Sequence, residues 1–426
     1  MERLTGIIGI VVILAICYAM SNNKKRINLK TVGMGLLLQF ALAVFVLKVP
    51  LGQFIIEKIG LFINKVLEFS DVGANFVFGF LNNSPDKLDE LFYAGAGFIF
   101  AIKLMATIIF ILALVNILYY FGIMQRVVEF FAKIMHKLMD VSGAEALSNV
   151  ASAFVGQVEA QILIRPYLAS LTRSELLASM AGSMACIAGG VMAIYIAMGI
   201  PAKFLLAASI MAAPGALVVA KIVYPETKLA KTKGTIKVEV EKTHVNLIDA
   251  IAAGATDGVK VSLNVIGMLI ALLAIIAMID WILGGVGSFL ATKLGWSLSA
   301  INIDLANLNL KSILGAVFSL FAAIMGVPLP DIASVGALMG EKLVLNEFIA
   351  YLDLSAIQTT LAPKSVMIAS FALCGFANFG SIAIQIGGIG SLAPSRRKDL
   401  AILGVRALIC GTFASYISAC IAGILM

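Results

Sequence analysis

The chain has 426 residues, of which 61% are hydrophobic and only 13% are charged, and its mean hydropathy is +1.03. A soluble globular protein is about half apolar and about a quarter charged. So little charge cannot cover the water-facing surface of the two or three soluble domains that this length allows. The composition therefore predicts a polytopic membrane protein, and it argues against soluble enzymes and nucleic-acid-binding proteins.

The few charged and metal-binding residues narrow the class further. Lys and Arg number 31 against 24 Asp and Glu, and the positive charges gather in short clusters, which is typical of loops facing the cytoplasm. The five cysteines lie in apolar runs without a C-x-x-C spacing, so we expect neither a disulfide framework nor a zinc site. Only His136 and His244 are available for histidine-based chemistry.

A helix needs about 20 predominantly apolar residues to cross the hydrocarbon core of a bilayer. Apolar runs of about this length predict eight spans, at residues 5–20, 31–49, 94–119, 175–198, 202–223, 261–283, 365–387 and 402–426. The first run has no cationic leader and no small-residue cleavage site, so we interpret it as a retained helix and not as a signal peptide.

The lysine-rich loops predict the orientation. Residues 24–30 hold four basic and no acidic side chains, and residues 221–242 form a second polar, lysine-rich linker. Both are expected on the cytoplasmic side, since four spans separate them. Arg396, Arg397 and Lys398 fit the same scheme, which places both termini outside.

Several stretches do not fit a simple span. Residues 123–138 alternate charged and apolar side chains with helical period, which predicts an interfacial amphipathic helix. Residues 143–170 and 331–354 are moderately apolar, too short to cross twice, and polar at their centres. We expect each to form a re-entrant hairpin, because non-helical backbone at membrane depth survives only inside protein or beside a wet cavity.

The two hairpins predict an internal repeat. Glu159 precedes Cys186 by 27 residues and Glu347 precedes Cys374 by the same interval, so that a shift of 188 residues maps one half onto the other. Transporters commonly use duplicated halves inverted across the membrane. The expected organisation is therefore an all-α chain with an amino-terminal scaffold (1–93), a first repeat (94–223), a cytoplasmic linker with an interfacial helix (224–260) and a second repeat (261–426).

Glu159 and Glu347 carry the strongest functional signal. An ionisable group at membrane depth costs about 2.5 to 3.5 kcal/mol even on insertion scales, so it needs a partner, a wet cavity or a proton. Each Glu could clamp its own hairpin through backbone N–H groups. The alternative, which we favour, is that the hairpin tips meet in the membrane interior and aim their carboxylates at a polar solute, since carboxylates accept charge-assisted hydrogen bonds from hydroxyl groups.

Gln157 and Asn378 extend this hypothesis, because a carboxamide both donates and accepts hydrogen bonds. Ser381 lies three residues after Asn378 and shares its helical face. Asn and Ser in membrane helices also serve simply to join neighbouring helices. Phe376 could stack on a planar ring or only pack.

These motifs resemble those of the concentrative nucleoside transporters. The segment G-E-K-L-V-L-N-E-F-I-A-Y at residues 340–351 is similar to the family signature G-x-K-x3-N-E-F-V-A-[YMF], and G-Q-V-E-A at 156–160 resembles the G-Q-T/S-E-A hairpin tip. Further similar segments are residues 27–33, 371–378 and 390–394, so the resemblance spans essentially the whole chain.

The resemblance implies a homotrimer in the cell inner membrane, each protomer having eight spans, two re-entrant hairpins and interfacial helices. It implies import of nucleosides by symport with Na+ or H+, through an elevator-like movement, without a cofactor or covalent chemistry. By similarity, Gln157, Val158 and Glu159 would face the base with Val191 beside it. Glu347, Asn378 and Ser381 would hold the ribose, with Phe376 alongside.

Departures from the family pattern affect the base site and the coupling ion. Val158 replaces a hydroxyl residue, Gln161 replaces a common Pro, and Gly380 replaces a Ser. The family's sodium site would correspond to the side chains of Ser152 and Cys186 and the carbonyls of Val155 and Ile187. A thiol is a poor ligand for a hard cation, so a proton carried by Glu159 or Glu347 is a competing and slightly preferred prediction.

Two other functional classes fit the sequence less well. A passive channel-like pore for small polar solutes could use the same duplicated halves, although paired hairpins close a site and do not line an open path. An intramembrane hydrolase is disfavoured because neither Glu lies in an H-E-x-x-H helix or near a histidine.

Overall fold

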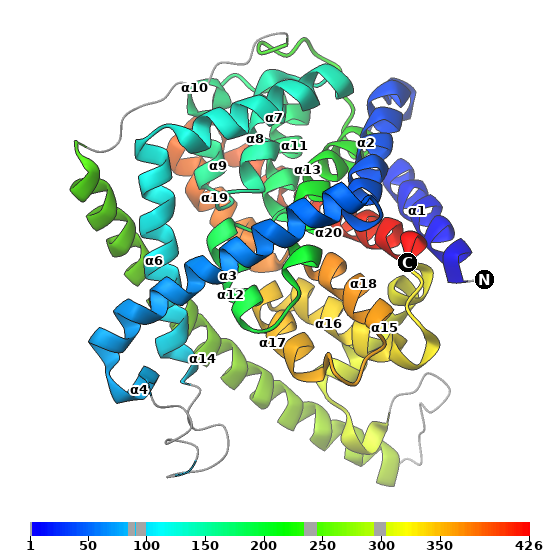
Figure 1. Cartoon of the computed structure of the whole chain (residues 1–426). Helices are drawn as coiled ribbons and strands as arrows, with labels where there is room; N and C mark the ends of the chain where they lie inside the picture. The colour runs from blue at the N-terminus through cyan, green and yellow to red at the C-terminus, as the bar shows by residue number, and fades with distance from the viewer. Residues whose placement is uncertain (1, 84–89, 91–98, 234–244, 294–303) are drawn as a thin grey trace.

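The computed structural model describes residues 2–83, 90, 99–233, 245–293 and 304–426, and every regular element in these ranges is helical. This confirms the all-α class. The beginning of the third predicted span (94–98), His244 and residues 234–244 of the polar linker lie outside the described residues. Figure 1 shows the arrangement, with the two termini at the same side of the molecule.

The amino-terminal part consists of two apolar helices, a long helix that crosses the front of the molecule in Figure 1, and a short helix after it. Asn28 caps the second apolar helix by accepting from the amides of Lys30 and Thr31, and Pro50 occupies the first turn of the long helix, where a missing N–H costs nothing. The elements are α1 (Glu2–Ala19), α2 (Leu29–Leu47), α3 (Pro50–Phe78) and α4 (Phe80–Asn83).

Two series of helices follow, and they repeat one order: a long helix, a shorter helix, a hairpin, a broken helix and a long helix. The first series is α6 (Phe100–Tyr120), α7 (Ile123–Met139), α8 (Gly143–Ser152), α9 (Glu159–Ile162), α10 (Arg165–Leu168), α11 (Arg173–Ala185), α12 (Gly189–Ala197) and α13 (Ala202–Val223). The second is α14 (Leu247–Lys293), α15 (Leu310–Ile324), α16 (Ile332–Val344), α17 (Glu347–Ile357), α18 (Pro363–Leu373), α19 (Phe379–Leu392) and α20 (Arg397–Leu425).

The repeat expected from the sequence matches these bounds. Helix α9 begins at Glu159 and α17 at Glu347, while α11 ends at Ala185 and α18 at Leu373, so both pairs are 188 residues apart. Short 3-10 turns link elements of the second series at Leu305–Asn307, Leu329–Asp331 and Pro394–Arg396. The relation of the two series to the membrane, including the re-entrance of the hairpins, stays a prediction.

Six stretches in the described part of the chain are long and apolar enough to cross a membrane. They correspond to the predicted spans beginning at residues 31, 94, 175, 202, 261 and 402, whereas the first predicted span coincides with the shorter helix α1. The spans predicted at 175–198 and 365–387 are each divided, into α11 and α12 and into α18 and α19. The count of eight spans stays a prediction.

The two breaks lie against each other at the centre of the molecule. Cys186 and Cys374 end their half-helices in extended conformations. Gly375 has φ +113°, and a Cβ there would be 2.5 Å from the carbonyl oxygen of Ala185. Only a glycine allows this backbone conformation and this close approach without strain. The second broken helix therefore crosses the first where both are unwound.

Around this crossing, burial separates a central from a peripheral layer. Helix α20 packs against α1, α11, α13, α18 and α19, and 83% of its most apolar window is buried. In α14 only 6% is buried, although the helix is more hydropathic. Such an apolar but exposed helix, packed along α6, has the character of a lipid-facing element.

The structure differs from the prediction at the end of the polar linker, where α14 begins. The linker at 224–260 was expected to hold an interfacial helix before a span at 261–283, but α14 is one continuous helix of 47 residues that begins at Leu247 and runs through both. At 1.5 Å per residue it is about 70 Å long, more than twice the thickness of the hydrocarbon core. It must therefore extend beyond the core at one end or both.

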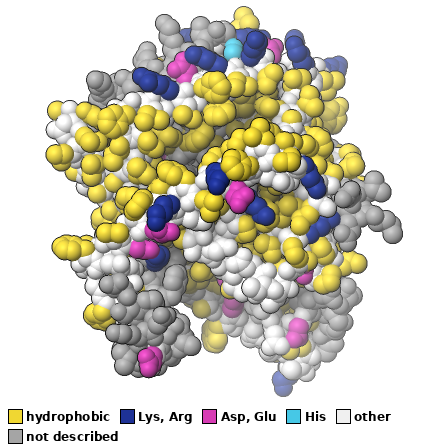
Figure 2. Space-filling model, viewed as in Figure 1, with side chains coloured by type: hydrophobic (Ala, Val, Ile, Leu, Met, Phe, Trp, Pro, Cys, Tyr) yellow, Lys and Arg dark blue, Asp and Glu magenta, His cyan; other side chains and the backbone are white. Residues whose placement is uncertain are grey.

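Helix α7 is amphipathic as predicted, and it carries two apolar stripes. Val128, Ala132, Met135 and Met139 are buried, while Phe130, Phe131, Ile134 and Leu138 are exposed. Figure 2 shows hydrophobic side chains over much of the visible face, with Lys and Arg along the upper edge, where Figure 1 places α7. This charge distribution is the one expected at a membrane–water boundary.

Candidate functional site

Asn378 is the central polar residue between the breaks and the second hairpin. It is the N-cap of α19, and its Oδ1 accepts from the backbone amide of Ser381 at 2.9 Å. Its Nδ2 donates to Glu347 Oε2 at 3.0 Å. One carboxamide thus satisfies a helix end and fixes a carboxylate, which sets its orientation without ambiguity.

Glu347 is buried, with 6% of its surface exposed. It is the first residue of α17, whose N-cap Asn346 accepts from the amide of Ile349 at 3.0 Å, so the carboxylate lies at the positive end of a helix dipole. Tyr195 of α12 donates its hydroxyl to Oε1 at 3.2 Å. Each carboxylate oxygen keeps a further lone pair for a hydroxyl donor.

Gln157 connects the tip of the first hairpin with α19. Its Nε2 donates to Ser381 Oγ at 3.3 Å, and its Oε1 accepts from Gln385 Nε2 at 3.4 Å. Gln385 also donates to the carbonyl of Met180 at 3.1 Å. The contacts of Gln157 are longer than the usual 2.9 to 3.0 Å for N–H···O bonds, so this part of the polar chain is the easiest to separate.

The predicted apolar contacts occupy the same region. Val158 packs against Gly388 of α19, where a Cβ would collide with its side chain. Val191 and Phe376 are half-buried. Val191 lies just beyond the first break, in the first turn of α12, and Phe376 lies within the second break, between α18 and α19.

Glu159 differs from Glu347. Its side chain is exposed and folds back against Gly156, where a Cβ would overlap its carboxylate. Of the two carboxylates, the structure therefore buries only that of Glu347, and the position of Glu159 in the membrane interior stays a prediction. The physical reason is local: Glu159 begins the four-residue helix α9 directly after an irregular tip, whereas Glu347 begins an eleven-residue helix packed on α18.

The four residues predicted as a sodium site, Ser152, Val155, Cys186 and Ile187, are all buried. Ser152 Oγ donates to the carbonyl of Ser148 at 2.7 Å and lies 3.0 Å from Ser183 Oγ. The Cys186 thiol is 4.0 Å from the carbonyl of Ser209. The hydroxyl next to Ser152 is thus that of Ser183, an oxygen donor better suited to a hard cation than the thiol.

Gln161 ties this region together. Its Nε2 donates to Ser148 Oγ at 3.0 Å and to Ser183 Oγ at 2.7 Å, while its Oε1 accepts from Ser179 Oγ at 2.5 Å. A proline, common in the family at this position, could make none of these contacts. The replacement noted in the sequence is therefore compensated by a buried hydrogen-bonded seam between α8, α9 and α11.

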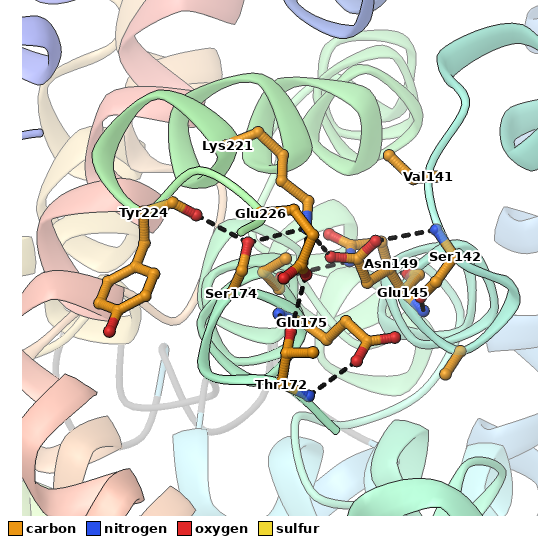
Figure 3. Close-up of polar contacts among 12 residues, drawn as sticks. Val141, Ser142, Glu145, Asn149, Thr172, Ser174, Glu175, Lys221, Tyr224 and Glu226 are labelled. Carbon is orange, nitrogen blue, oxygen red and sulfur yellow. Dashed lines mark hydrogen bonds and ion pairs between the residues drawn. The ribbon is translucent and has the colours of Figure 1, made fainter. Parts of the chain in front are cut away.

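A charged cluster anchors the other ends of α8 and α11 (Figure 3). Both helices begin with a capping box, Ser142 with Glu145 and Thr172 with Glu175. Lys221 of α13 forms an ion pair with Glu145 and donates to Ser174 Oγ at 2.9 Å, and its Nζ lies 3.6 Å from a Glu226 oxygen. The pairing and the two helix N-termini offset the desolvation of these buried carboxylates.

Sequence reasoning missed Tyr195, Gln385, Ser183 and Gln161 as members of the polar network. A signal was available for two of them, because Gln385 lies four residues after Ser381, and Ser183 three before Cys186, each on a shared helical face. Nothing local marks Tyr195, which reaches Glu347 only because α12 packs against the second hairpin.

The chain matches three family models, two of which describe Na+-dependent nucleoside transporters. "Na+ dependent nucleoside transporter C-terminus" matches residues 204–423, "Na+ dependent nucleoside transporter N-terminus" matches residues 8–81, and "Nucleoside recognition" matches residues 101–202. Together they cover both series of helices and the amino-terminal part.

Similar proteins agree with these matches. The putative nucleoside permease NupX of Escherichia coli is 40% identical over 99% of this chain and 99% of its own length. The transporter CNTnw in an inward-facing substrate-bound state is 39% identical with a TM-score of 0.90, covering 100% of this chain and 98% of that one. A variant of CNTnw in an outward-facing state gives a TM-score of 0.91 at 39% identity, covering 100% and 98% of the two chains.

Proposed function

The chain belongs to the family of Na+-dependent nucleoside transporters, and from this premise we propose that it imports nucleosides across the cell inner membrane by cation symport. The observation that carries the proposal is the polar chain from Tyr195 through Glu347, Asn378 and Ser381 to Gln157. It joins the tips of both hairpins to a broken helix, the arrangement that secondary transporters use at their substrate sites.

The two ends of this chain suit the two halves of a nucleoside. Glu347 and Asn378 offer a fixed carboxylate and carboxamide to the ribose hydroxyls, and charge-assisted O–H···O⁻ bonds are stronger than neutral ones. Gln157 offers a donor and an acceptor to the edge of the base. Its contacts to Ser381 and Gln385, at 3.3 and 3.4 Å, are the ones that a bound base would replace. Val158, Val191 and Phe376 would supply the apolar surfaces around it.

The packing of the same elements supports alternating access. The hairpins and broken helices contact one another in each series, α8 with α11 and α16 with α18, so each pair can move as a unit. We propose that these units carry the nucleoside in an elevator-like movement against a scaffold that includes α1 to α3. Related CNTnw chains in inward-facing and outward-facing states support alternation between two such positions.

For the coupling ion we propose Na+ held by oxygen atoms at the ends of α8 and α11. Ser152 and Ser183 supply adjacent hydroxyls there, and the carbonyls of residues 155 and 187 would complete the set. The second candidate is a proton on Glu347, favoured by its burial. In either case one cation moves down its gradient with the nucleoside.

Uptake by the purified protein in liposomes tests the proposal. An inward Na+ gradient and an inward pH gradient are each imposed alone, and radiolabelled uridine and adenosine should accumulate under one of them. The gradient that drives accumulation identifies the coupling ion. Absence of accumulation under both gradients would refute symport. Flux that is independent of either gradient and does not saturate would instead support the passive pore.

A further inference from the structure

Lys342 is the most deeply buried cation in the described part of the chain, with 1% of its surface exposed. It lies in the last turn of α16. Its ammonium donates to the carbonyl of Ala372 at 2.8 Å and to that of Cys374 at 3.2 Å. Within the described residues, the ion pairs found do not include Lys342, so its partners are backbone carbonyls at the end of α18.

Such a position has a clear electrostatic character. The last carbonyls of a helix have no intrahelical partner and carry a partial negative charge. Here the last turn of α16 lies beside the end of α18 and places one ammonium on the α18 carbonyls, and Ser415 of α20 donates a further hydrogen bond to the Cys374 carbonyl at 2.5 Å. The ammonium therefore offsets the negative end of α18 beside the break that presents Asn378.

The first series of helices has the same pair of adjacent helix ends, but it has no lysine there. Helices α8 and α11 also end side by side, where Ser152 and Ser183 hydroxyls are 3.0 Å apart. Helix α8 has 10 residues and α16 has 13, and the additional turn of α16 carries Lys342. The residue 188 positions before it is Phe154, whose ring stacks on Phe131 at 6.4 Å.

We propose that the Lys342 ammonium is a cation tethered to the chain that stabilises the second break. At the equivalent position of the first repeat, the first break binds a cation from solution instead. This inference rests on the proposed function and adds to it. Lys342 is a positioning residue: it fixes the carbonyls before Asn378, and it gives one series a cation that is part of the chain, whereas the other series takes an exchangeable one. One solution cation should then accompany each nucleoside.

The number of solution cations per nucleoside can be measured as the charge transported per nucleoside, because nucleosides themselves are neutral. In liposomes, integrated current compared with radiolabelled uridine uptake should give one charge per uridine for the unchanged protein, whichever cation is coupled. Two charges per uridine would overturn the proposal without the need for any variant.

Three substitutions separate charge from packing. Lys342→Met keeps the side-chain length and should reduce uptake at least tenfold, whereas Lys342→Arg should retain most of it. Lys342→Ala leaves a space, so its uptake should be low and partly restored by ethylammonium but not by ethanol at the same concentration. Lys398→Met, which removes an exposed cation from α20, is the control and should behave as the unchanged protein.

The outcomes distinguish this inference from the proposed function. If the unchanged protein takes up no nucleoside, symport fails, and the thermal midpoint of Lys342→Ala still reports the tethered cation, since ethylammonium should raise it and ethanol should not. If the unchanged protein transports and Lys342→Met transports equally well, the tethered cation is refuted while symport stands. Equal restoration by ethanol and ethylammonium would also refute it.

Discussion

At the scale of single residues, two glutamates that look equivalent in the sequence have different environments. Glu347 is buried and receives hydrogen bonds from Tyr195 and Asn378, while Glu159 is exposed. A fixed carboxylate can discriminate a ligand, because its hydrogen bonds are already oriented before binding. We therefore assign the larger part of nucleoside recognition to Glu347.

Replacing Glu347 by Gln should lower nucleoside uptake between about tenfold and about a hundredfold. Hydrogen bonds to charged groups are worth about 1.5 to 3 kcal/mol, and the carboxamide keeps the shape while it loses the charge. Uridine uptake in liposomes measures the effect. Glu57→Gln, an exposed position on α3, is the matched control, and unchanged uptake by Glu347→Gln would remove Glu347 from the site.

At the scale of elements, the broken helices position the polar chain. A continuous helix would satisfy its own backbone and leave the Asn378 side chain without an N–H group to cap. The breaks free the ends of four half-helices, and Asn378 caps one of these ends, the N-terminus of α19. The approach of Gly375 to Ala185 brings the two breaks together.

Gly375→Ala should destabilise the fold by at least about 1 to 3 kcal/mol, the usual cost of a sparsely populated backbone conformation, with an added clash against Ala185. The thermal midpoint of the purified protein measures this. Gly387→Ala in α19, which meets no atom within 4 Å, is the control and should be neutral or stabilising by up to about 1 kcal/mol. A midpoint of Gly375→Ala equal to that of the control would contradict this account of the crossing.

At the scale of the whole molecule, large apolar side chains remain exposed on α3 and α14. Phe76 is 91% and Trp281 80% exposed. Water-facing surfaces of monomeric proteins rarely carry large contiguous patches of such side chains. In a membrane protein such a surface is covered either by lipid or by a neighbouring protomer. The resemblance to concentrative nucleoside transporters predicts the second arrangement for part of this surface, in a homotrimer.

The trimer predicts a protein mass of three 45.0 kDa chains for the purified protein in mild detergent. Light scattering corrected for bound detergent measures this mass. The burial of apolar area between protomers should keep the assembly intact on dilution. A particle with the mass of a single chain under these conditions would contradict the prediction.

The sequence by itself determined the class, most helix positions and the family. Apolar runs of a given length allow few structures in a bilayer, because every backbone group must be satisfied within the segment. The 188-residue interval and the motifs at 156–160 and 340–351 identified both hairpins and most of the candidate site. The spans and the repeat follow from local sequence patterns, whereas the family and the roles of the site residues came from the resemblance of these motifs.

Tertiary structure alone decided which polar groups meet. The exposure of Glu159, the approach of Tyr195 to Glu347, the seam around Gln161 and the contact of Lys342 with the end of α18 all join residues of different elements. Such contacts depend on how the broken helices cross, and no periodicity in one segment encodes that crossing. Charged residues are rare in this composition, and the roles proposed for Glu347 and Lys342 depend on the helix ends beside them.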